Sequence, residues 1–518
     1  MTAVFDHSWK LLSDQEQQVL RWLSVFRGGF TREAAEQVTG ARLPTLSSLL
    51  DKSLVRRSGS GRYVLHELTR HYAREQLIHS GEFENANNQH LKYFLAFVHE
   101  ANLNLYDTEQ IPWLDRLEQD YDNLRAALEW SLRFAGTEAA ISGASVVEPA
   151  QYALRLASML YQFWKRRSHW TEGRQWLQRV LDQSTFLPGT HERVHALNAA
   201  ALLAAEQADT RSARQFAEEN LKLAHELEAL QNIASAHNTL GVVLWKQKNY
   251  AEARAQCEQG LAMFRELDDR LAVADSLHSL GHITINQGDL EAAQSYLNES
   301  LSISQELENA IGIVEALADL GLLAYLRNDF ARAQSYLEDS LIRYRAAGLV
   351  PGMVSALNRL GDLARCQGDY EKAGQLYTEG LSLYRELGDL DEIPSILHNL
   401  GYVAQHLGDY SQALVLFKEG LVIQHQMGNQ AGIAECLMGI AGVVSAQGQV
   451  ETGALLFGAA EVLRKRVGAS LWPANQIESD CILDRLHSLM DEPSLIATLA
   501  KGRSMPTEHI IGKALEHS

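Results

Sequence analysis

The 518-residue sequence lacks several features that define common protein classes. It has only four cysteines, which are far apart and form no Cys-x-x-Cys pair, so neither a disulfide framework nor a zinc ribbon is indicated. No run of about 18 uninterrupted apolar residues occurs, and the start, MTAVFDHSWK, has no basic segment followed by an apolar one. We therefore expect a cytoplasmic protein without a membrane segment.

The sequence also has fewer positively charged than negatively charged residues. Lys and Arg number 46 against 65 Asp and Glu, which gives a net charge of -19. Non-specific affinity for nucleic acids comes from Lys and Arg that neutralise phosphates, so binding to a phosphate backbone is not the expected main task. The hydrophobic content of 46% and charged content of 21% are typical of a globular chain, and the length allows two or more cores.

Two motifs of nucleotide and ester chemistry are absent. No G-x-x-x-x-G-K-[ST] loop occurs, and the single Gly-Lys pair, Gly512-Lys513, does not end one. No Gly-x-Ser-x-Gly elbow is present either. The sequence thus predicts a chain that is not an enzyme, with no catalytic residues of its own.

Two histidine-containing strings have to be weighed as metal sites. HELTRH places His66 and His71 five residues apart, about 140° around a helix, so they cannot share a face as zinc ligands do. HERVH, from His191 to His195, has the spacing of a zinc protease, and Glu218 and Glu219 are conceivable third ligands. The repeat register described next places that string at a turn and the start of a helix, so we expect no metal site.

The sequence is rich in internal repetition. A Leu-Gly pair recurs with a period of 40 residues at Leu240-Gly241, Leu280-Gly281, Leu320-Gly321, Leu360-Gly361 and Leu400-Gly401. A turn and then an aromatic or aliphatic residue follow each glycine, and an alanine stands twelve residues after it. Between these marks the apolar residues recur at helical spacing, which predicts a helix, a tight turn and a second helix in each unit. Weaker copies on both sides give about eight units over residues 150–465.

A glycine inside a helix costs about 1 kcal/mol relative to alanine, so its recurrence needs a reason. We expect it to let the paired helix approach closely, with the alanine twelve residues later as its partner. The pattern of Leu-Gly, aromatic residue and alanine resembles the tetratricopeptide repeat, in a 40-residue rather than a 34-residue form. The resemblance implies a mainly α fold in which the repeats form an α-solenoid whose first helices line a concave groove.

Two columns of residues point into that groove by this resemblance, three residues before and four residues after each glycine. Asn and His recur there and resemble the polar ladders by which such repeats hold peptide backbones or ligand carboxylates. The alternative is that these residues only solvate the groove. The candidate residues for binding a protein, peptide or small-molecule ligand are Asn198, Asn238, Trp245, His278, Tyr325, Asn358, Arg365 and His398.

Residues 1–85 follow a different pattern. Helices are expected at 13–26 behind a Ser-x-x-Glu capping box, at 31–38, at 44–52 and from residue 68, with two short strands in LVRRSGSGRYVLHE. This order predicts a winged helix. Its third helix, PTLSSLLDKS, offers no Arg, Asn or Gln to a base edge, so we do not expect direct DNA binding, although Arg56, Arg57 and Arg62 of the wing could contact phosphates.

Three strings resemble the winged helix that follows the nucleotide-binding module in NB-ARC signal-transduction ATPases of the STAND class. These strings are FDHSWKLLSDQEQQVLRWLSVFRGGFTREAAEQV, LLDKSLVRR and RYVLHELTRHYAREQL. These ATPases include bacterial regulators of the LuxR, AfsR and MalT type with a tetratricopeptide sensor arm. DYDNLRAALEWSL, WTEGRQWLQRVL and GALLFGAAEVLRKRVGA, with the tail KGRSMPTEHIIGKALE, fit the same group. The printed sequence resembles that arm without the P-loop module.

In that family a Met-His-Asp motif stands where the wing meets the last helix, and its histidine contacts the β-phosphate of ADP. The matching residues are Leu65, His66 and Glu67. The resemblance implies that His66 and Glu67 sense ADP held by a missing module or by an NB-ARC P-loop partner. No cofactor is expected in this chain itself, and ADP or ATP would come only through such a module.

These observations predict four regions: a winged helix at 1–85, a helical linker at 86–149, the repeats at 150–465 and capping helices at 466–518. The expected function is a non-catalytic sensor whose groove ligand acts through the winged helix on a nucleotide-binding module, in transcriptional or signalling control. The alternative is a free-standing scaffold or adaptor that binds a peptide through its repeats.

Overall fold

The computed structural model describes residues 6, 8–59, 61–105, 110–133, 147–185, 189–387, 393–468 and 471–516. Residues 1–287 with 307–310 form one compact unit, and 288–306 with 311–518 form a second. The described residues are nearly all helical, with one two-stranded sheet. None of their helices is both long and apolar enough to cross a membrane.

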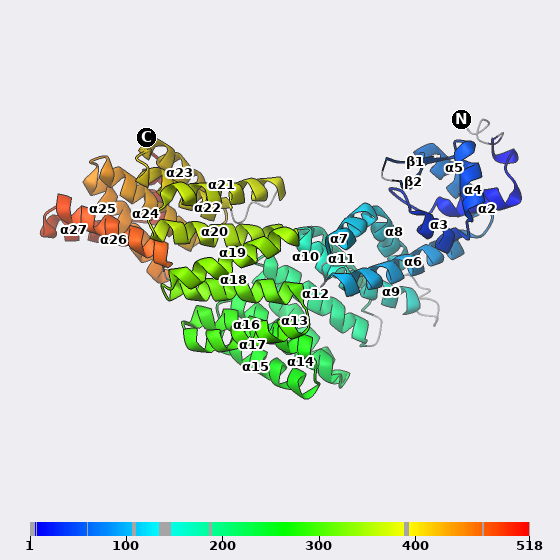
Figure 1. Ribbon diagram of the computed structural model, residues 1–518, viewed down its shortest axis with the longest axis horizontal. Coiled ribbons are helices and arrows are strands. Elements are labelled where there is room, and N and C mark those ends of the chain that lie inside the picture. Colours follow the sequence, from blue (N-terminus) through cyan, green and yellow to red (C-terminus); the bar gives the residue numbers. More distant parts are fainter. Residues whose placement is uncertain are drawn as a thin grey trace. The chain divides into compact units, whose positions relative to one another are not determined.

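The first unit begins with the predicted winged helix (Figure 1). Its elements are α2 (Asp14–Leu23), α3 (Arg32–Thr39), α4 (Leu43–Asp51), β1 (Val55–Arg57), β2 (Tyr63–Leu65) and α5 (Glu67–His79). The capping box is confirmed, because the backbone amide of Glu16 donates to Ser13 Oγ at 3.3 Å and that of Ser13 donates to Glu16 Oε2 at 2.7 Å. Helix α2 ends at Leu23, three residues before the predicted end, and Phe26 lies buried in the turn that follows.

Three helices follow the winged helix, α6 (Phe83–Asn104), α7 (Gln110–Gln119) and α8 (Tyr121–Leu132). The amide of Asn123 joins α8 to the winged helix, because its Oδ1 accepts from the Arg27 amide at 2.6 Å and its Nδ2 donates to the Gly29 carbonyl at 2.8 Å. Arg62 of the wing forms a buried ion pair with Asp120 at 2.5 Å. Arg62 is therefore engaged inside the protein. The sequence suggested instead that this side chain could contact phosphates.

The repeats form eight helix-turn-helix units in sequence order, as predicted (Figure 1). The first helix of the first unit is divided at Leu160. The helices are α9 (Val147–Met159), α10 (Tyr161–Arg166), α11 (Trp170–Gln183), α12 (His191–Glu206), α13 (Thr210–Glu226), α14 (Leu230–Lys246), α15 (Tyr250–Glu266), α16 (Arg270–Gln287), α17 (Leu290–Glu306), α18 (Ala310–Leu326), α19 (Phe330–Ala346), α20 (Val350–Cys366), α21 (Tyr370–Leu387), α22 (Ile393–His406), α23 (Tyr410–Gln426), α24 (Gln430–Ala446) and α25 (Val450–Arg466).

The 40-residue period is two steps of 20, because most helices from α13 to α25 have 17 residues and most of the described turns between them have three. Each described turn between α12 and α25 contains one residue in the left-handed region, either glycine, as at Gly408 (φ 83), or another residue, as at Lys248 (φ 62). The turn after α14 shows the geometry, since the Asn249 amide donates to the Leu244 carbonyl at 3.0 Å, which closes the helix end. In several turns the residue after the left-handed one also caps the following helix, as Asp409 does by accepting from the Gln412 amide at 2.9 Å.

The Leu-Gly glycines do allow close helix approach, but the predicted partner is wrong. A Cβ on Gly361 would lie 2.4 Å from Cε1 of Tyr377, and one on Gly401 would lie 2.7 Å from Cε1 of Phe417. These partners stand sixteen residues after the glycine. The alanine at position twelve lies four residues earlier on the same helix face, one turn nearer the hairpin, and its methyl group is too short to reach across. At Gly241 the backbone carbonyl of the alanine, Ala253, also comes near, at 3.0 Å.

The left-handed turns give a test of the repeat geometry. Gly408→Ala should lower the free energy of unfolding by about 1 kcal/mol, because an L residue pays about 1–2 kcal/mol in the left-handed region and regains part of this from a stiffer unfolded chain. Gly512→Ala, inside helix α28 (Thr507–Glu516), should instead raise it by about 0.5–1 kcal/mol. A Cβ meets no atom within 4 Å at either position. Urea unfolding of the full chain measures both, and equal effects would contradict the assigned turn.

Candidate functional site

Three helices follow the last repeat, α26 (Pro473–Leu489), α27 (Glu492–Ser504) and α28 (Thr507–Glu516). Helix α27 packs on α25, and α28 packs on α23, α24 and α25, as expected of capping helices. Helix α26 instead contacts α20 and α24, which are first helices of their repeats, besides α25. The chain's own C-terminal region therefore covers part of the surface predicted to receive a ligand.

The buried guanidinium of Arg365 on α20 is the main polar link to α26. The residue is 3% exposed, and its Nη2 lies 3.2 Å from Glu478 Oε1 of α26. Its Nη1 donates to Asn399 Oδ1 at 3.0 Å and lies 3.7 Å from Asp362 Oδ1, while the guanidinium carbon sits 4.7 Å from the centroid of the Tyr402 ring. Burial raises the pKa of Asp362, and Arg365 offsets part of that rise.

Two further side chains from the repeats fix the same helix. The hydroxyl of Tyr325 on α18 is buried and accepts from the Ala474 amide at 2.9 Å. His406, at the end of α22, lies 2.8 Å from the second oxygen of Glu478 and stacks on Tyr370 with ring centroids 4.0 Å apart. Side chains from three repeats thus hold the first turns of α26.

His398 lies in the interior beside this network. It is 3% exposed, and neither ring nitrogen makes a hydrogen bond with the described residues. Burial lowers its pKa to about 3, with Arg365 acting in the same direction and the nearby amide of Asn475 opposing it, so the ring is neutral at pH 7. The imidazole packs against the Tyr402 ring in a T-shaped arrangement, with the two ring centroids 4.9 Å apart. A buried imidazole without polar partners is uncommon, and here it borders a cavity.

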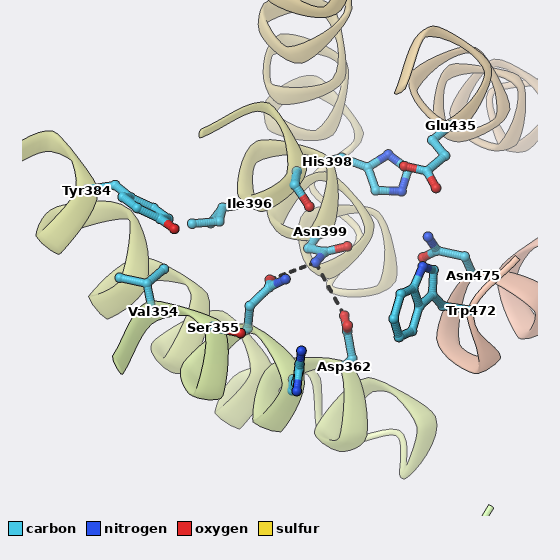
Figure 2. Close-up of a pocket in the computed structure, with 13 residues that line it drawn as sticks. Val354, Ser355, Asp362, Tyr384, Ile396, His398, Asn399, Glu435, Trp472 and Asn475 are labelled. Atoms are coloured by element: carbon cyan, nitrogen blue, oxygen red, sulfur yellow. Dashed lines mark hydrogen bonds between the residues drawn. The ribbon is translucent and has the colours of Figure 1, made fainter. Parts of the chain in front are cut away.

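That cavity has a volume of about 380 Å³ and is lined by residues of α20, α21, α22 and α24 and of the start of α26 (Figure 2). The amide of Asn399 spans its floor and donates to Asn358 Oδ1 at 2.9 Å and to Asp362 Oδ1 at 3.3 Å. Trp472, which is 41% exposed, and Asn475 supply the wall from the α26 side. We call this cavity the repeat pocket.

Glu435 of α24 contributes the last polar group to the repeat pocket. It makes no hydrogen bond or ion pair with any residue that the structure describes. Burial and the charge of Asp362 raise its pKa to about 7, against the effect of Arg365. The repeat pocket therefore combines a neutral imidazole, a readily protonated carboxyl and several amides, and these groups can donate and accept hydrogen bonds to a polar ligand.

The eight predicted groove residues fall into three groups. Asn358 and His398 line the repeat pocket, while Tyr325 and Arg365 are buried by α26 and are not open to a ligand as an exposed groove would require. The other four lie in the first unit and are half-buried. Asn198 contacts Thr239 and Asn238 contacts Ser276 at 2.5 Å on the next first helix. The Trp245 ring centroid lies 5.5 Å from that of His282, and the His278 ring lies 4.9 Å from the His282 ring on the same helix, α16.

Five residues of the site were missed by sequence reasoning: Asp362, Asn399, Glu435, Asn475 and Glu478. One signal was present. The residue directly after the Leu-Gly glycine is apolar or aromatic in most units, but it is an aspartate at position 362. A charged residue at the position after the glycine needs partners once it is buried. Asp362 therefore distinguishes its repeat from the others.

His66 and Glu67 lie at the predicted joint between β2 and α5. His66 is the N-cap of α5, with Nδ1 accepting from the Leu68 amide at 3.3 Å, and its side chain is exposed. Glu67 pairs with Arg70, whose Nε lies 3.1 Å from Glu67 Oε2, and this contact lowers the pKa of Glu67. Contact of either residue with a nucleotide stays a prediction.

The HERVH string lies on α12. Its His191 contacts the Asn232 amide at 2.9 Å, and Glu219, weighed as a third ligand, forms an ion pair with Arg193 at 2.8 Å. Among the described residues no third ligand comes within reach of both His191 and His195.

Comparison with known families agrees with this architecture. A model described as Tetratricopeptide repeat matches residues 232–306, 278–346 and 352–426, and one described as Winged helix-turn-helix domain matches residues 12–78. The chain is therefore a winged-helix protein with an array of tetratricopeptide repeats. Together these domains are those of a regulatory or protein-interaction protein.

Curated relatives from Mycobacterium tuberculosis and Mycobacterium bovis, named as HTH-type transcriptional regulators, are 34% identical over 197 residues. This region is 36% of the chain but only 20% of each relative, so the chain matches about a fifth of their length. Among solved structures, a STAND protein with a tetratricopeptide repeat sensor from Pyrococcus horikoshii has 14% identity and a TM-score of 0.44, over 82% of this chain and 64% of that one. A Rap protein complexed with Competence and Sporulation Factor has 12% identity and a TM-score of 0.46, over 67% and 99%.

Arg365→Met tests the link between the repeats and α26. Removing the guanidinium leaves Glu478 and Asp362 as buried carboxyls without their cation, which should lower the free energy of unfolding by about 3–5 kcal/mol. Arg345→Met, which breaks a half-exposed pair with Glu379, should cost at most about 1 kcal/mol. Urea unfolding compares the two variants, and similar losses would show that Arg365 does not hold α26.

Glu435→Gln tests the unpaired carboxyl. The folded chain holds this proton more tightly than the unfolded one, so stability is lost as pH rises from about 4.5 to about 7 and is constant above. The variant should therefore be as stable as the wild type near pH 4.5 and more stable at pH 8. Thermal unfolding across this range measures the difference, and exposed Glu371→Gln is the control. A constant difference at every pH would contradict the raised pKa.

Proposed function

We propose that the chain is a non-catalytic sensor in which the repeat pocket binds a peptide or a small polar ligand. The observation that carries this is the repeat pocket itself, where the buried imidazole of His398 and the carboxyl of Glu435 have no partner among the described residues. Buried polar groups without partners cost free energy, and a ligand that satisfies them recovers it.

The same pocket supports a switching role. Its wall combines repeat helices with Trp472 and Asn475 from the start of α26, so a ligand that contacts both would favour one position of that helix. To move such an equilibrium from 1% to 99%, the ligand has to prefer the favoured state by about 5.5 kcal/mol. A few charge-assisted hydrogen bonds of about 1.5–3 kcal/mol each supply energy of that size.

We infer further that the winged helix couples ligand binding to an NB-ARC nucleotide-binding module in transcriptional or signalling control. Support comes from the place of His66 at the cap of α5 and from the regulators that share 34% identity with part of the chain. Direct DNA reading is not favoured, because α4 contains no basic residue between its caps, Arg42 and Lys52, and the Lys52 side chain is paired with Glu16 at 2.6 Å.

A free-standing adaptor that binds a peptide through its repeats is the second candidate. The coupled sensor and the free-standing adaptor differ in the partners that they bind. Capture of a separate P-loop ATPase by the full chain favours the coupled sensor, and capture of only a peptide-bearing protein favours the adaptor.

Native mass spectrometry of the full chain, incubated with a cell extract and repurified, tests ligand binding. The wild type should carry a bound peptide or polar molecule of defined mass. Ser355→Trp should lose it, because this exposed side chain borders the repeat pocket and an indole there fills the space. Ser302→Trp, on exposed surface of α17, is the control and should retain the ligand. A wild type that carries nothing, or two variants that behave alike, would contradict the proposal.

A further inference from the structure

The charged groups of the repeat pocket indicate the chemical class of its ligand, an inference that rests on the proposed function of that pocket. Two of the side chains that line it carry carboxyl groups, Asp362 and Glu435, and one carries a guanidinium group, Arg359. The group that has no counterion within the protein decides which charge a ligand should bring.

The arginines at the repeat pocket already have counterions. Arg359 lies 3.5 Å from Asp319 Oδ1 of the preceding repeat. Arg365, behind the lining, lies 3.7 Å from Asp362 Oδ1 and 3.2 Å from Glu478 Oε1. Two guanidinium groups thus have three carboxyl partners, and Glu435 adds a fourth carboxyl group to the same region.

Glu435 is the carboxyl group without a counterion. Its side chain points from α24 into the repeat pocket (Figure 2) and makes no hydrogen bond or ion pair with the residues that the structure describes. The basic side chain of His406 is engaged elsewhere, at 2.8 Å from Glu478 Oε2. A buried carboxylate without a counterion is unfavourable, and a positive charge beside Glu435 would stabilise its ionised form.

Two other side chains of the repeat pocket suit a cation that carries N–H groups. His398 is 3% exposed, and neither of its ring nitrogens has a hydrogen-bond partner among the described residues. One nitrogen of a neutral imidazole accepts hydrogen bonds. Trp472 is 41% exposed and borders the same space, and the face of an indole ring attracts cations.

We propose that the repeat pocket binds a cationic group of its ligand, an ammonium or a guanidinium carried by a peptide or by a small molecule. The N–H groups of this cation donate to the carboxylate of Glu435 and to His398, and the indole of Trp472 lies against it. Charge-assisted hydrogen bonds of this kind are stronger than neutral ones. An anionic ligand is disfavoured, because it would lie beside Asp362 and Glu435 while the nearby arginines are already paired.

Isothermal titration of the full chain with three tripeptides tests the preference for a cation. The tripeptides have blocked ends and carry arginine, citrulline or glutamate between two alanines, so the central side chain is positive, neutral or negative. Citrulline nearly keeps the shape of arginine. At pH 8, above the pKa of Glu435 of about 7, the arginine peptide should bind at least about tenfold more tightly than the citrulline peptide. Equal or tighter binding of the citrulline or glutamate peptide overturns the proposal.

Agmatine, which carries a guanidinium and an ammonium group, distinguishes the two sources of the cation. Tighter binding of agmatine than of the arginine peptide assigns the site to a small molecule, and tighter binding of the peptide assigns it to a peptide side chain. Saturable binding of neither overturns the proposal.

Variants of the full chain separate a contact with the ligand from a structural role. Glu435→Gln keeps the shape of the side chain but removes its charge and should weaken binding of the cation by about tenfold or more. Glu435→Asp keeps the charge and should retain more of the affinity. Trp472→Leu should weaken binding several-fold, and Glu371→Gln, at an exposed position of α21, is the control that should leave it unchanged. Unchanged affinity in both Glu435→Gln and Trp472→Leu overturns the proposal.

Failure of this proposal can be distinguished from failure of the proposed function. Native mass spectrometry of the wild type and Ser355→Trp reports whether the repeat pocket holds any ligand, whatever its charge. A captured ligand that Ser355→Trp loses but Glu435→Gln retains with unchanged affinity would keep the repeat pocket as a ligand site and overturn only its preference for a cation.

Discussion

The second compact unit depends on how a single buried guanidinium is satisfied. Arg365 is 3% exposed, and a charge in that position is tolerated only with close partners. Its own repeat supplies Asp362 and the next supplies Asn399, but the bridging carboxylate, Glu478, comes from 113 residues further along the chain. This requirement brings α26 onto the inner helices and makes its start part of the wall of the repeat pocket.

The regularity of the repeats explains why one polar cluster can stand out. Successive helices begin 20 residues apart over most of the array, and their described turns share a residue in the left-handed region. Because the spacing of the helices is uniform, the repeats differ mainly in their side chains. The units that carry Asp362, His398 and Glu435 on their first helices form the repeat pocket.

Local patterns allowed much of the fold to be predicted from the sequence. The 40-residue period, the capping box at Ser13 and the hairpin before α5 each depend on residues close together in the chain, and each is confirmed. The close approach at the Leu-Gly glycines was predicted too, but its partner was not, because the side chain that reaches over the glycine is decided by its length as well as by its helix face.

The candidate site was less predictable because it depends on contacts between distant segments. The helix register places Asn358 and His398 on an inner face, and both line the repeat pocket. The repeat pattern does not predict that α26 packs on this face. Its contacts to Tyr325 and Arg365 span 149 and 113 residues of sequence and are not repeated along the array. The burial of Arg365 decides whether its side chain can contact a ligand or supports the interior. That burial results from the docking of α26, which the sequence did not predict.

Hydrogen–deuterium exchange of the full chain tests the docking of α26 most directly. Exchange of a helical amide requires local opening, and a helix held by a buried ion pair opens only with the elements that hold it. The account predicts that amides in the middle of α26 exchange as slowly as those of α20 and α24. Rapid exchange throughout α26, with α20 and α24 protected, would contradict it.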